Sequence, residues 1–345
     1  MHGIALTPGS NLWFTILPKD TWLFGLRRPG IEPSTPCAPE PRLLHTEAKS
    51  GFEGSAGCVS RGCSTRWQRG EEVRDENSLK EKSKGKTRVG DSELLTMGDL
   101  QSHRKMFNLI KNTFPEIMVN SEEHDNVVDK AATWSQDIPA DIYKIPAGKD
   151  VPAESITVWI DPLDATQEYT ENLVKYVTTM VCVAVDGKPV IGVIHQPFTG
   201  FTAWAFVGVG SNMRPRSSYS VSPPKVIVSR SHSGKVKSFV HDAFGNSTTI
   251  VEAGGAGYKV LSLLEMPADT IDQADVYIHI RFIKKWDICA GAALLNHMGG
   301  HMTTLKGEDI DYSGTPINKG GLVVSVGVDH KAMLERLPNW DPEKH

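Results

Sequence analysis

The chain reads Ile156-Thr157-Val158-Trp159-Ile160-Asp161-Pro162-Leu163-Asp164 at the position that decides its fold. Ile156, Val158 and Ile160 alternate with other residues, and this period of two predicts a half-buried strand. Pro162 has no backbone N–H to donate to a neighbouring strand, so we expect the strand to end at Asp161. The end of this strand is therefore the first place to search for a functional site.

Two carboxylates and a backbone carbonyl follow one another at this strand end. Asp161 and Asp164 are three positions apart, and the carbonyl of Leu163 lies between them in the chain. Oxygen ligands crowded in this way suit Mg²⁺ better than zinc. The alternative is an Asp-Pro turn with solvated acids, which an isolated motif of this kind favours. The other motifs of the chain decide between the two interpretations.

Length and composition are those of a soluble globular protein with one large domain or two. The chain has 345 residues, of which 39% are hydrophobic and 23% charged, and its formal net charge is −4. This charge gives no electrostatic reason to expect a nucleic-acid partner. The most apolar N-terminal stretch, residues 11–26, is interrupted by Pro18, Lys19 and Asp20, so we expect neither a membrane span nor a signal peptide there.

The cysteines predict no disulfide framework, because their number is odd and no C-x-x-C pair occurs. They are Cys37, Cys58, Cys63, Cys182 and Cys289. Cys58 and Cys63 are near enough in sequence to pair. Cys182 and Cys289 lie in apolar runs, and we expect them to be small core residues.

The chain divides into three parts by composition. Residues 1–76 are rich in Pro and then in Gly, Ser and Arg, and we expect them to be irregular or disordered. The basic run from Lys80 to Arg88 predicts a solvated linker. We expect residues 77–212 to form the first half of a catalytic domain, with the metal site, and residues 213–345 to form the nucleotide-binding half.

Regular structure is expected from about Leu94 onward, as strands and helices that alternate in layers around a mixed sheet. Asp186-Gly187 between two apolar runs predicts a hairpin. The predicted helices lie between Asp99 and Pro115 and at 258–264, 288–298 and 331–337. The predicted strands are 117–120, 156–161, 176–185, 190–195, 201–207, 226–229, 276–280 and 322–326.

Acidic residues recur at the ends of these elements, at Asp99, Glu122-Glu123, Asp161, Asp164 and Asp287. Taken singly, each acid can be explained by a structural role alone. Asp99 and Asp287 are placed to cap helices, and Glu122 is placed to be a solvated loop acid. Together, however, they lie where α/β proteins place their sites.

The order of these motifs resembles the lithium-sensitive, magnesium-dependent phosphatases of the inositol monophosphatase superfamily. That family's signatures are Glu-Glu, D-P-[IL]-D-[GA]-T and W-D-x-x-[AC]-[AG]. This chain has them as Glu122-Glu123, Asp161-Pro162-Leu163-Asp164-Ala165-Thr166 and Trp286-Asp287-Ile288-Cys289-Ala290-Gly291. The resemblance covers about residues 77–340 and implies an α+β fold with layers in the order αβαβα, of the sugar-phosphatase type.

Three further stretches are similar to the Golgi branch of this superfamily, whose substrate is 3′-phosphoadenosine 5′-phosphate. They are residues 164–170, 228–234 and 253–259, and Ala165, where most relatives have glycine, is typical of that branch. The resemblance implies hydrolysis of the 3′-phosphate to give AMP and phosphate. The alternatives are a broader bisphosphate nucleotidase, an inositol-phosphate phosphatase, or a catalytically silent nucleotide-binding variant.

The resemblance also implies a role for each matching residue. Two or three Mg²⁺ ions would be ligated by Glu122, Asp161, the carbonyl of Leu163, Asp164 and Asp287. Asp99 and Thr166 would position the nucleophilic water. Ser229, His232, Gly255 and Lys259 would hold the nucleotide bisphosphate.

Residues 1–76 do not match the membrane anchor and packed helices that precede the basic linker in the Golgi branch. That branch is lumenal, whereas this difference predicts a cytosolic chain with an exposed apolar sheet face. The sequon Asn246-Ser247-Thr248 would then stay unglycosylated. Relatives are often dimers, so a homodimer is one assembly that the resemblance implies.

Overall fold

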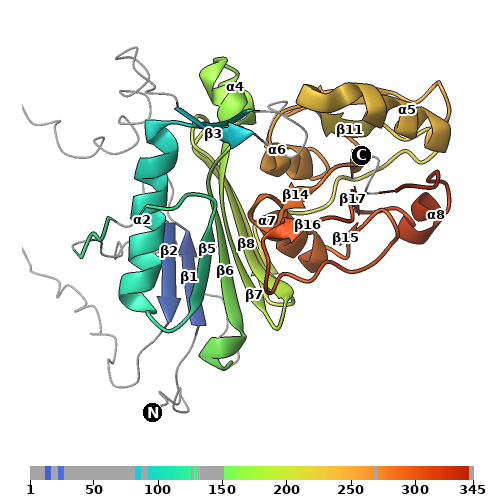
Figure 1. Cartoon of the computed structure of the whole chain (residues 1–345). Helices are drawn as coiled ribbons and strands as arrows, with labels where there is room; N and C mark the ends of the chain where they lie inside the picture. The colour runs from blue at the N-terminus through green and yellow to red at the C-terminus, as the bar shows by residue number, and fades with distance from the viewer. Residues whose placement is uncertain are drawn as a thin grey trace, which may run out of the picture.

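The computed structural model describes residues 12–16, 22–26, 82–86, 92–125, 127–130, 132, 151–267 and 271–341. Layers of helix and sheet alternate across the molecule, with helices outside the first sheet, between the two sheets and outside the second sheet (Figure 1). The helices are α2 (Met97–Thr113), α4 (Thr166–Thr170), α5 (Ser233–Phe244), α6 (Ala256–Leu261), α7 (Lys285–His297) and α8 (His330–Leu334). The αβαβα layering expected from the sequence is confirmed.

The first sheet has six strands in the order β10-β9-β8-β7-β6-β5. Its strands are β5 (Met118–Ser121), β6 (Ile156–Asp164), β7 (Thr178–Val185), β8 (Lys188–Gln196), β9 (Phe201–Phe206) and β10 (Gly210–Ser211). All neighbours are antiparallel except β5 and β6, which are parallel. The β7–β8 hairpin turns at Asp186-Gly187, where both residues have positive φ, as the sequence predicted.

The second sheet has five strands in the order β12-β11-β13-β17-β15. Its strands are β11 (Val226–Ser229), β12 (Ile250–Ala253), β13 (Val276–His279), β15 (His301–Thr303) and β17 (Leu322–Ser325). β11 is parallel to both β12 and β13, so these strands end at the same edge of the sheet. A short pair, β14 (Ile283–Lys284) and β16 (Ile317–Asn318), leads into α7.

Strand β6 runs past Asp161, so the expectation that Pro162 ends it is wrong. Its pairing with β7 shifts register between Asp161 and Asp164, and Pro162 lies in that irregularity. A residue in a bulge has no ladder hydrogen bond to make, so proline is tolerated there. The bulge keeps both acids at the strand end while changing the direction of the chain between them.

The faces of β6 are both buried, although the alternation predicted a half-buried strand. Ile156, Val158 and Ile160 pack with residues of α2 in one core cluster. Trp159 points to the other face and joins the large cluster that includes α6 and α7. Because helices cover both faces of the sheet, the side chains between the apolar positions are buried as well, and Asp161 is one of them.

Neither helix-start acid is an N-cap. The N-cap of α2 is Thr96, whose hydroxyl accepts from the N–H groups of Gly98 and Asp99, and Asp99 is the third helical residue. In α7 the N-cap position is Lys284, whose N–H donates to Oδ2 of Asp287 at 3.1 Å. Each acid therefore sits one turn inside its helix, with its carboxylate folded back to the helix start.

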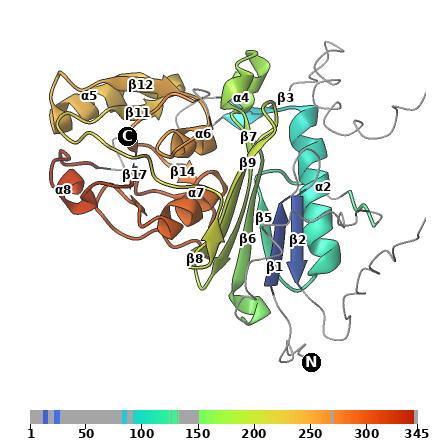
Figure 2. The same cartoon turned by 180° about the vertical axis from the view of Figure 1, so that it is seen from behind.

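Two strand pairs lie outside the regions where strands were expected. β1 (Leu12–Ile16) and β2 (Trp22–Leu26) are antiparallel and lie beside α2 on the outer side of the first sheet (Figure 1, Figure 2). β3 (Lys82–Lys86) pairs with β4 (Ser92–Leu95) where a solvated linker was expected. These expectations are wrong for the residues named, and the other residues of 1–76, with Cys37, Cys58 and Cys63, lie outside the described residues.

The sequence also did not predict α5, β12 and β15. Helix α5 packs Val236, Phe239, Val240 and Phe244 on the outer face of the second sheet, at the spacing of a helix.

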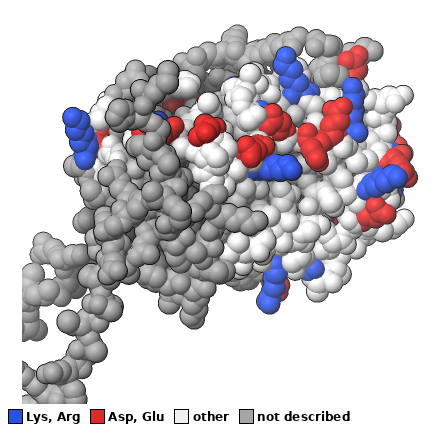
Figure 3. All heavy atoms as spheres, turned by 90° about the horizontal axis from the view of Figure 1, so that it is seen from below, with Lys and Arg blue, Asp and Glu red and all other residues white. Residues whose placement is uncertain are grey.

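Acidic and basic side chains are interspersed on the face shown in Figure 3. Of the described helices, none is long and apolar enough to cross a membrane.

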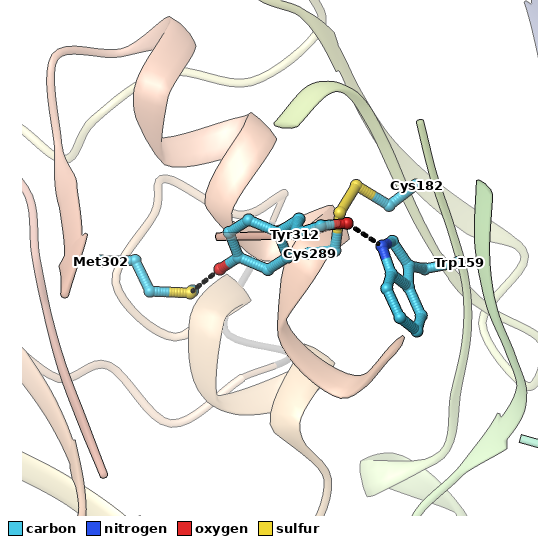
Figure 4. The surroundings of a disulfide bond; sticks show 5 residues. All are labelled: Trp159, Cys182, Cys289, Met302 and Tyr312. Carbon is cyan, nitrogen blue, oxygen red and sulfur yellow. Dashed lines mark hydrogen bonds between the residues drawn. A yellow bond between two sulfur atoms is a disulfide. The ribbon is translucent and has the colours of Figure 1, made fainter. Parts of the chain in front are cut away.

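Cys182 and Cys289 form a disulfide, which corrects the expectation of two unpaired core cysteines. The bond ties β7 to α7 across 107 positions of the sequence, with Cα atoms 5.6 Å apart (Figure 4). Beside it, the indole N–H of Trp159 donates to the carbonyl of Tyr312 at 2.8 Å. A count of cysteines could not reveal this pair, because the stacking of the helix on the sheet brings them together.

Candidate active site

The acids singled out in the sequence gather around the end of β6. Asp161 is 1% exposed, whereas Asp164 and Asp287 are partly exposed. Glu122 follows β5, and its N–H donates to the carbonyl of Ile160 at 3.0 Å, which places it beside the end of β6. The parallel pairing of β5 with β6 thus joins two motifs that lie far apart in the chain.

Burial and mutual repulsion disfavour the charged forms of these acids. Burial raises the pKa of Asp161 well above its usual range, and the charges of Glu122, Asp164 and Asp287 raise it further. Burial and then Glu122 and Asp164 do the same for the pKa of Asp287. Among the described side chains, however, no three acids, histidines or cysteines are close enough together to hold one ion. The donor set suits a hard divalent cation, which would neutralise this repulsion.

Asp99 and Thr166 are in hydrogen-bond contact. Oδ1 of Asp99 lies 3.1 Å from the hydroxyl of Thr166, which is also 3.0 Å from the carbonyl of Leu163. Oδ2 of Asp99 accepts from the backbone N–H of Thr96 at 2.7 Å and from its hydroxyl at 2.5 Å. The carboxylate is therefore fixed on both oxygens and is completely buried, and Thr166 joins it to the carbonyl of Leu163 at the acid cluster.

Asp164 is held by β7 and by the start of α6. Its Oδ2 accepts from the hydroxyl of Thr178 at 3.0 Å and from the N–H of Gly257 at 2.8 Å. Ala165, the next residue, has a φ of 69°, in the left-handed region that favours glycine. This backbone turn lets α4 start directly after the strand, and it explains why glycine suits the position in related motifs.

Gly255, in the glycine-rich loop, also lies close to Asp164. Its φ is 64°, and a Cβ atom there would lie 2.6 Å from the carbonyl oxygen of Tyr176 and 3.0 Å from Oδ2 of Asp164. Any larger residue would push the loop away from the end of β6. The glycine is thus required by the close approach of two segments.

Lys259 lies in α6 and is 3% exposed. Burial lowers its pKa, while the charges of Asp164, Glu168 and Asp287 raise it. Its Nζ lies 5.4 Å from the centre of the Tyr277 ring, but its ammonium has no hydrogen bond or ion pair within the described part of the chain. A buried ammonium that no carboxylate pairs directly is costly, so this position is suited to an anionic ligand.

Ser229 ends β11, directly opposite Ala253 at the end of the parallel strand β12. His232 lies in the short helix η3 (Arg230–His232) that follows, and its side chain is outside the described residues. The edge formed by β11 and β12 thus carries both motifs that were predicted to bind the nucleotide, the one after β11 and the glycine loop after β12.

Two site residues had no role in the sequence prediction. Glu168 is 5% exposed and lies against the glycine loop, since a Cβ on Gly254 would be 2.4 Å from its Cδ. Arg230 donates to Glu168 at 3.2 Å and to Glu171 at 2.6 Å. Both lie in stretches that the sequence singled out, but only the packing of α4 against η3 reveals that they interact.

Comparisons with known proteins agree with this geometry. The model of the inositol monophosphatase family matches residues 60–339. Inositol monophosphatase 3 of Danio rerio is 67% identical over 273 residues, which are 79% of this chain and 80% of that protein. The Golgi-resident adenosine 3′,5′-bisphosphate 3′-phosphatase of Homo sapiens is 56% identical over 275 residues, 79% of this chain and 77% of that protein. A crystal structure of an IMPase/NADP phosphatase complexed with Mg²⁺ and phosphate has a TM-score of 0.54 at 18% identity, covering 78% of this chain and 90% of the other.

Proposed function

Since the chain belongs to the inositol monophosphatase family, a family of phosphatases, we propose that it hydrolyses the 3′-phosphate of adenosine 3′,5′-bisphosphate to give AMP and phosphate. The observation that carries the proposal is the buried, unpaired ammonium of Lys259 beside the acid cluster of β6. A relative named for this reaction, 56% identical, supports it.

Mg²⁺ is the proposed cofactor, and the oxygen donors present fit its chemistry. Its ligands would be Glu122, Asp161, the carbonyl of Leu163, Asp164 and Asp287, all of them hard oxygen donors. When bound, the cation would neutralise charge on the phosphate and lower the pKa of a bound water. The pKa values of Asp161 and Asp287 are raised as long as no cation lies between these carboxylates to offset their repulsion.

The chain's own contribution to hydrolysis is the pair Asp99 and Thr166. The Thr166 hydroxyl has one proton to donate, and Oδ1 of Asp99 lies 3.1 Å away to accept it. The lone pairs of that hydroxyl are then free to accept a hydrogen bond from a water and so to orient it. Because Thr96 fixes the other oxygen of Asp99, the direction of this pair is set before substrate arrives.

Lys259 distinguishes between the substrates. The acid cluster and its cations would accommodate one phosphate, whereas Lys259 comes from α6 and lies near Asp164. A second phosphate would supply the anion that this ammonium lacks. Inositol 1-phosphate has only one phosphate, so it would leave Lys259 buried without a partner.

An inositol phosphate is nevertheless the second candidate substrate, because a 67% identical relative is named inositol monophosphatase 3. A catalytically silent nucleotide-binding variant is the third reading. All the acids of the family motifs are present in this chain, which argues against silence.

Phosphate release by the purified chain tests these readings. Adenosine 3′,5′-bisphosphate and inositol 1-phosphate are compared with Mg²⁺ and with EDTA, and chromatography shows which adenosine monophosphate is formed. We expect Mg²⁺-dependent formation of the 5′-monophosphate, with kcat/KM at least tenfold above that for inositol 1-phosphate. Formation of the 3′-monophosphate, or a preference for inositol 1-phosphate, would reject the proposed substrate.

The disulfide favours an oxidising compartment over the cytosol that residues 1–76 suggested. Buried disulfides such as Cys182–Cys289 form and persist in the secretory pathway and are rare in the cytosol. A relative is named as Golgi-resident, and Asn246 of the sequon is exposed. Treatment of the chain expressed in cells with an endoglycosidase tests this. A mobility shift on treatment that is absent in the Asn246→Gln variant would show that Asn246 is glycosylated and that the chain enters the lumen.

A further inference from the structure

Three charged residues connect the metal side of the site with its nucleotide side. Nη1 of Arg230 donates to Oε1 of Glu168 at 3.2 Å and to Oε2 of Glu171 at 2.6 Å. We call this group of Arg230, Glu168 and Glu171 the Arg230 latch. The proposed roles of metal ligands and nucleotide contacts use none of the three.

The acidic end of the latch is rigid. Glu168 is one turn from the start of α4, the helix that begins at Thr166, and it is 5% exposed. Its carboxyl group lies so close to Gly254 that a Cβ there would be 2.4 Å from Cδ. The position of Glu168 is therefore fixed by α4 on one side and by the glycine loop on the other.

The basic end lies in the segment that reaches the substrate. Arg230 directly follows Ser229, where β11 ends, and opens η3. The segment joins β11 to α5, and the side chain of Arg230 is about one-third exposed. Without the latch, this turn would be free to move relative to α4, because β11 pairs only with β12 and β13.

We propose that Arg230 is a positioning residue that fixes the Ser229–His232 segment on α4, and thereby sets the distance between the metal ligands and the contacts to the nucleoside and its second phosphate. This inference rests on the proposed function and names the device that gives that site its selectivity. A partly buried Arg that holds two carboxylates orders a loop better than a Lys, because its planar group is preorganised and more weakly hydrated and so loses less freedom for each hydrogen bond formed.

Kinetics of Arg230→Met test the latch, because Met keeps the apolar stem and removes the charge. We expect the KM for adenosine 3′,5′-bisphosphate to rise at least tenfold and kcat to fall less than threefold. The Kd for AMP, measured with Mg²⁺ by calorimetry, should rise by a similar factor, since AMP retains the part of the substrate that this segment contacts. Arg230→Lys should recover part of the loss.

Two further variants separate positioning from general damage. Adding Glu168→Gln to the Arg230→Met variant should raise the KM for adenosine 3′,5′-bisphosphate by less than a further factor of two, because each residue acts through the other. Arg214→Ala is the matched control, since Arg214 forms an ion pair with Glu265 but is 77% exposed at the surface. Its KM should be that of the wild type.

Several outcomes would overturn the latch. They are an unchanged KM and Kd in Arg230→Met, an equal loss of kcat for nucleotide and inositol phosphate, or additive effects of Arg230→Met and Glu168→Gln. A wild-type chain that releases no phosphate would instead reject the proposed function. In that case the Kd values of the wild type and of Arg230→Met for AMP would still test the latch.

Discussion

Oδ2 of Asp164 accepts a hydrogen bond of 2.8 Å from the backbone N–H of Gly257, 93 positions further along the chain. This bond joins the end of β6 to the start of α6, so the proposed metal ligand and the proposed nucleotide loop form one structure. A change on either side is therefore expected to act on both.

Gly257→Ala tests the closeness of this contact. A Cβ at Gly257 would lie 2.4 Å from Oγ1 of Thr178 and 3.0 Å from Sδ of Met180. We expect a loss of about 1–3 kcal/mol in the free energy of unfolding, as for overpacking elsewhere, together with a fall in kcat. Urea unfolding and kinetics measure the two effects. Gly234→Ala, where nothing lies within 4 Å of the added Cβ, should leave both unchanged or slightly improved.

Asp164→Asn tests the metal assignment. Asn keeps an oxygen that can accept from Gly257 but removes the charge, so the fold should persist while kcat falls more than a hundredfold. Changes around metal ligands already cost about ten- to a hundredfold, and a ligand should cost more. A variant with more than a tenth of the wild-type kcat at saturating Mg²⁺ would contradict the assignment.

Thr166→Val tests the pair with Asp99. The change removes the hydroxyl that lies 3.1 Å from Oδ1 of Asp99 and keeps the volume of the side chain. We expect kcat to fall about a hundredfold or more, in the range of lost acid–base catalysis. Thr166→Ser keeps the hydroxyl and should stay within tenfold of the wild type; an equal loss in both variants would argue against the role.

Lys259→Ala tests substrate choice. Loss of a charge-assisted contact costs about 1.5–3 kcal/mol, so kcat/KM for adenosine 3′,5′-bisphosphate should fall by more than tenfold. Inositol 1-phosphate brings no second phosphate and should be affected much less. If both substrates lose the same factor, Lys259 has no role in specificity.

Reduction of Cys182–Cys289 should destabilise the protein. The bond closes a loop of 107 positions between β7 and α7, and disulfides contribute about 2–4 kcal/mol by restricting the unfolded chain. Thermal unfolding with and without a reductant measures the difference, and the Cys182→Ala/Cys289→Ala variant should no longer respond to the reductant. A wild-type melting temperature that a reductant leaves unchanged after full thiol release would contradict this expectation.

The sequence by itself determined the local structure and the chemical character of the site. The period of two at Ile156–Ile160 and the Asp186-Gly187 turn predicted β6 and the β7–β8 hairpin, because strand period and turn chemistry depend only on neighbouring residues. The helical spacing of Val236, Phe239 and Val240 is a local pattern of the same kind, and these residues lie in α5. The acid motifs indicated a cation site, because carboxylate oxygens are recognisable without a structure.

Only the tertiary structure decided which distant residues meet. The Cys182–Cys289 bond, the Arg230 latch and the contact of Asp164 with Gly257 each join segments that are more than 50 positions apart. Such pairs follow from how helices stack between two sheets, and no local pattern records that stacking. The same stacking buries both faces of β6, which is why Asp161 is buried at the strand end.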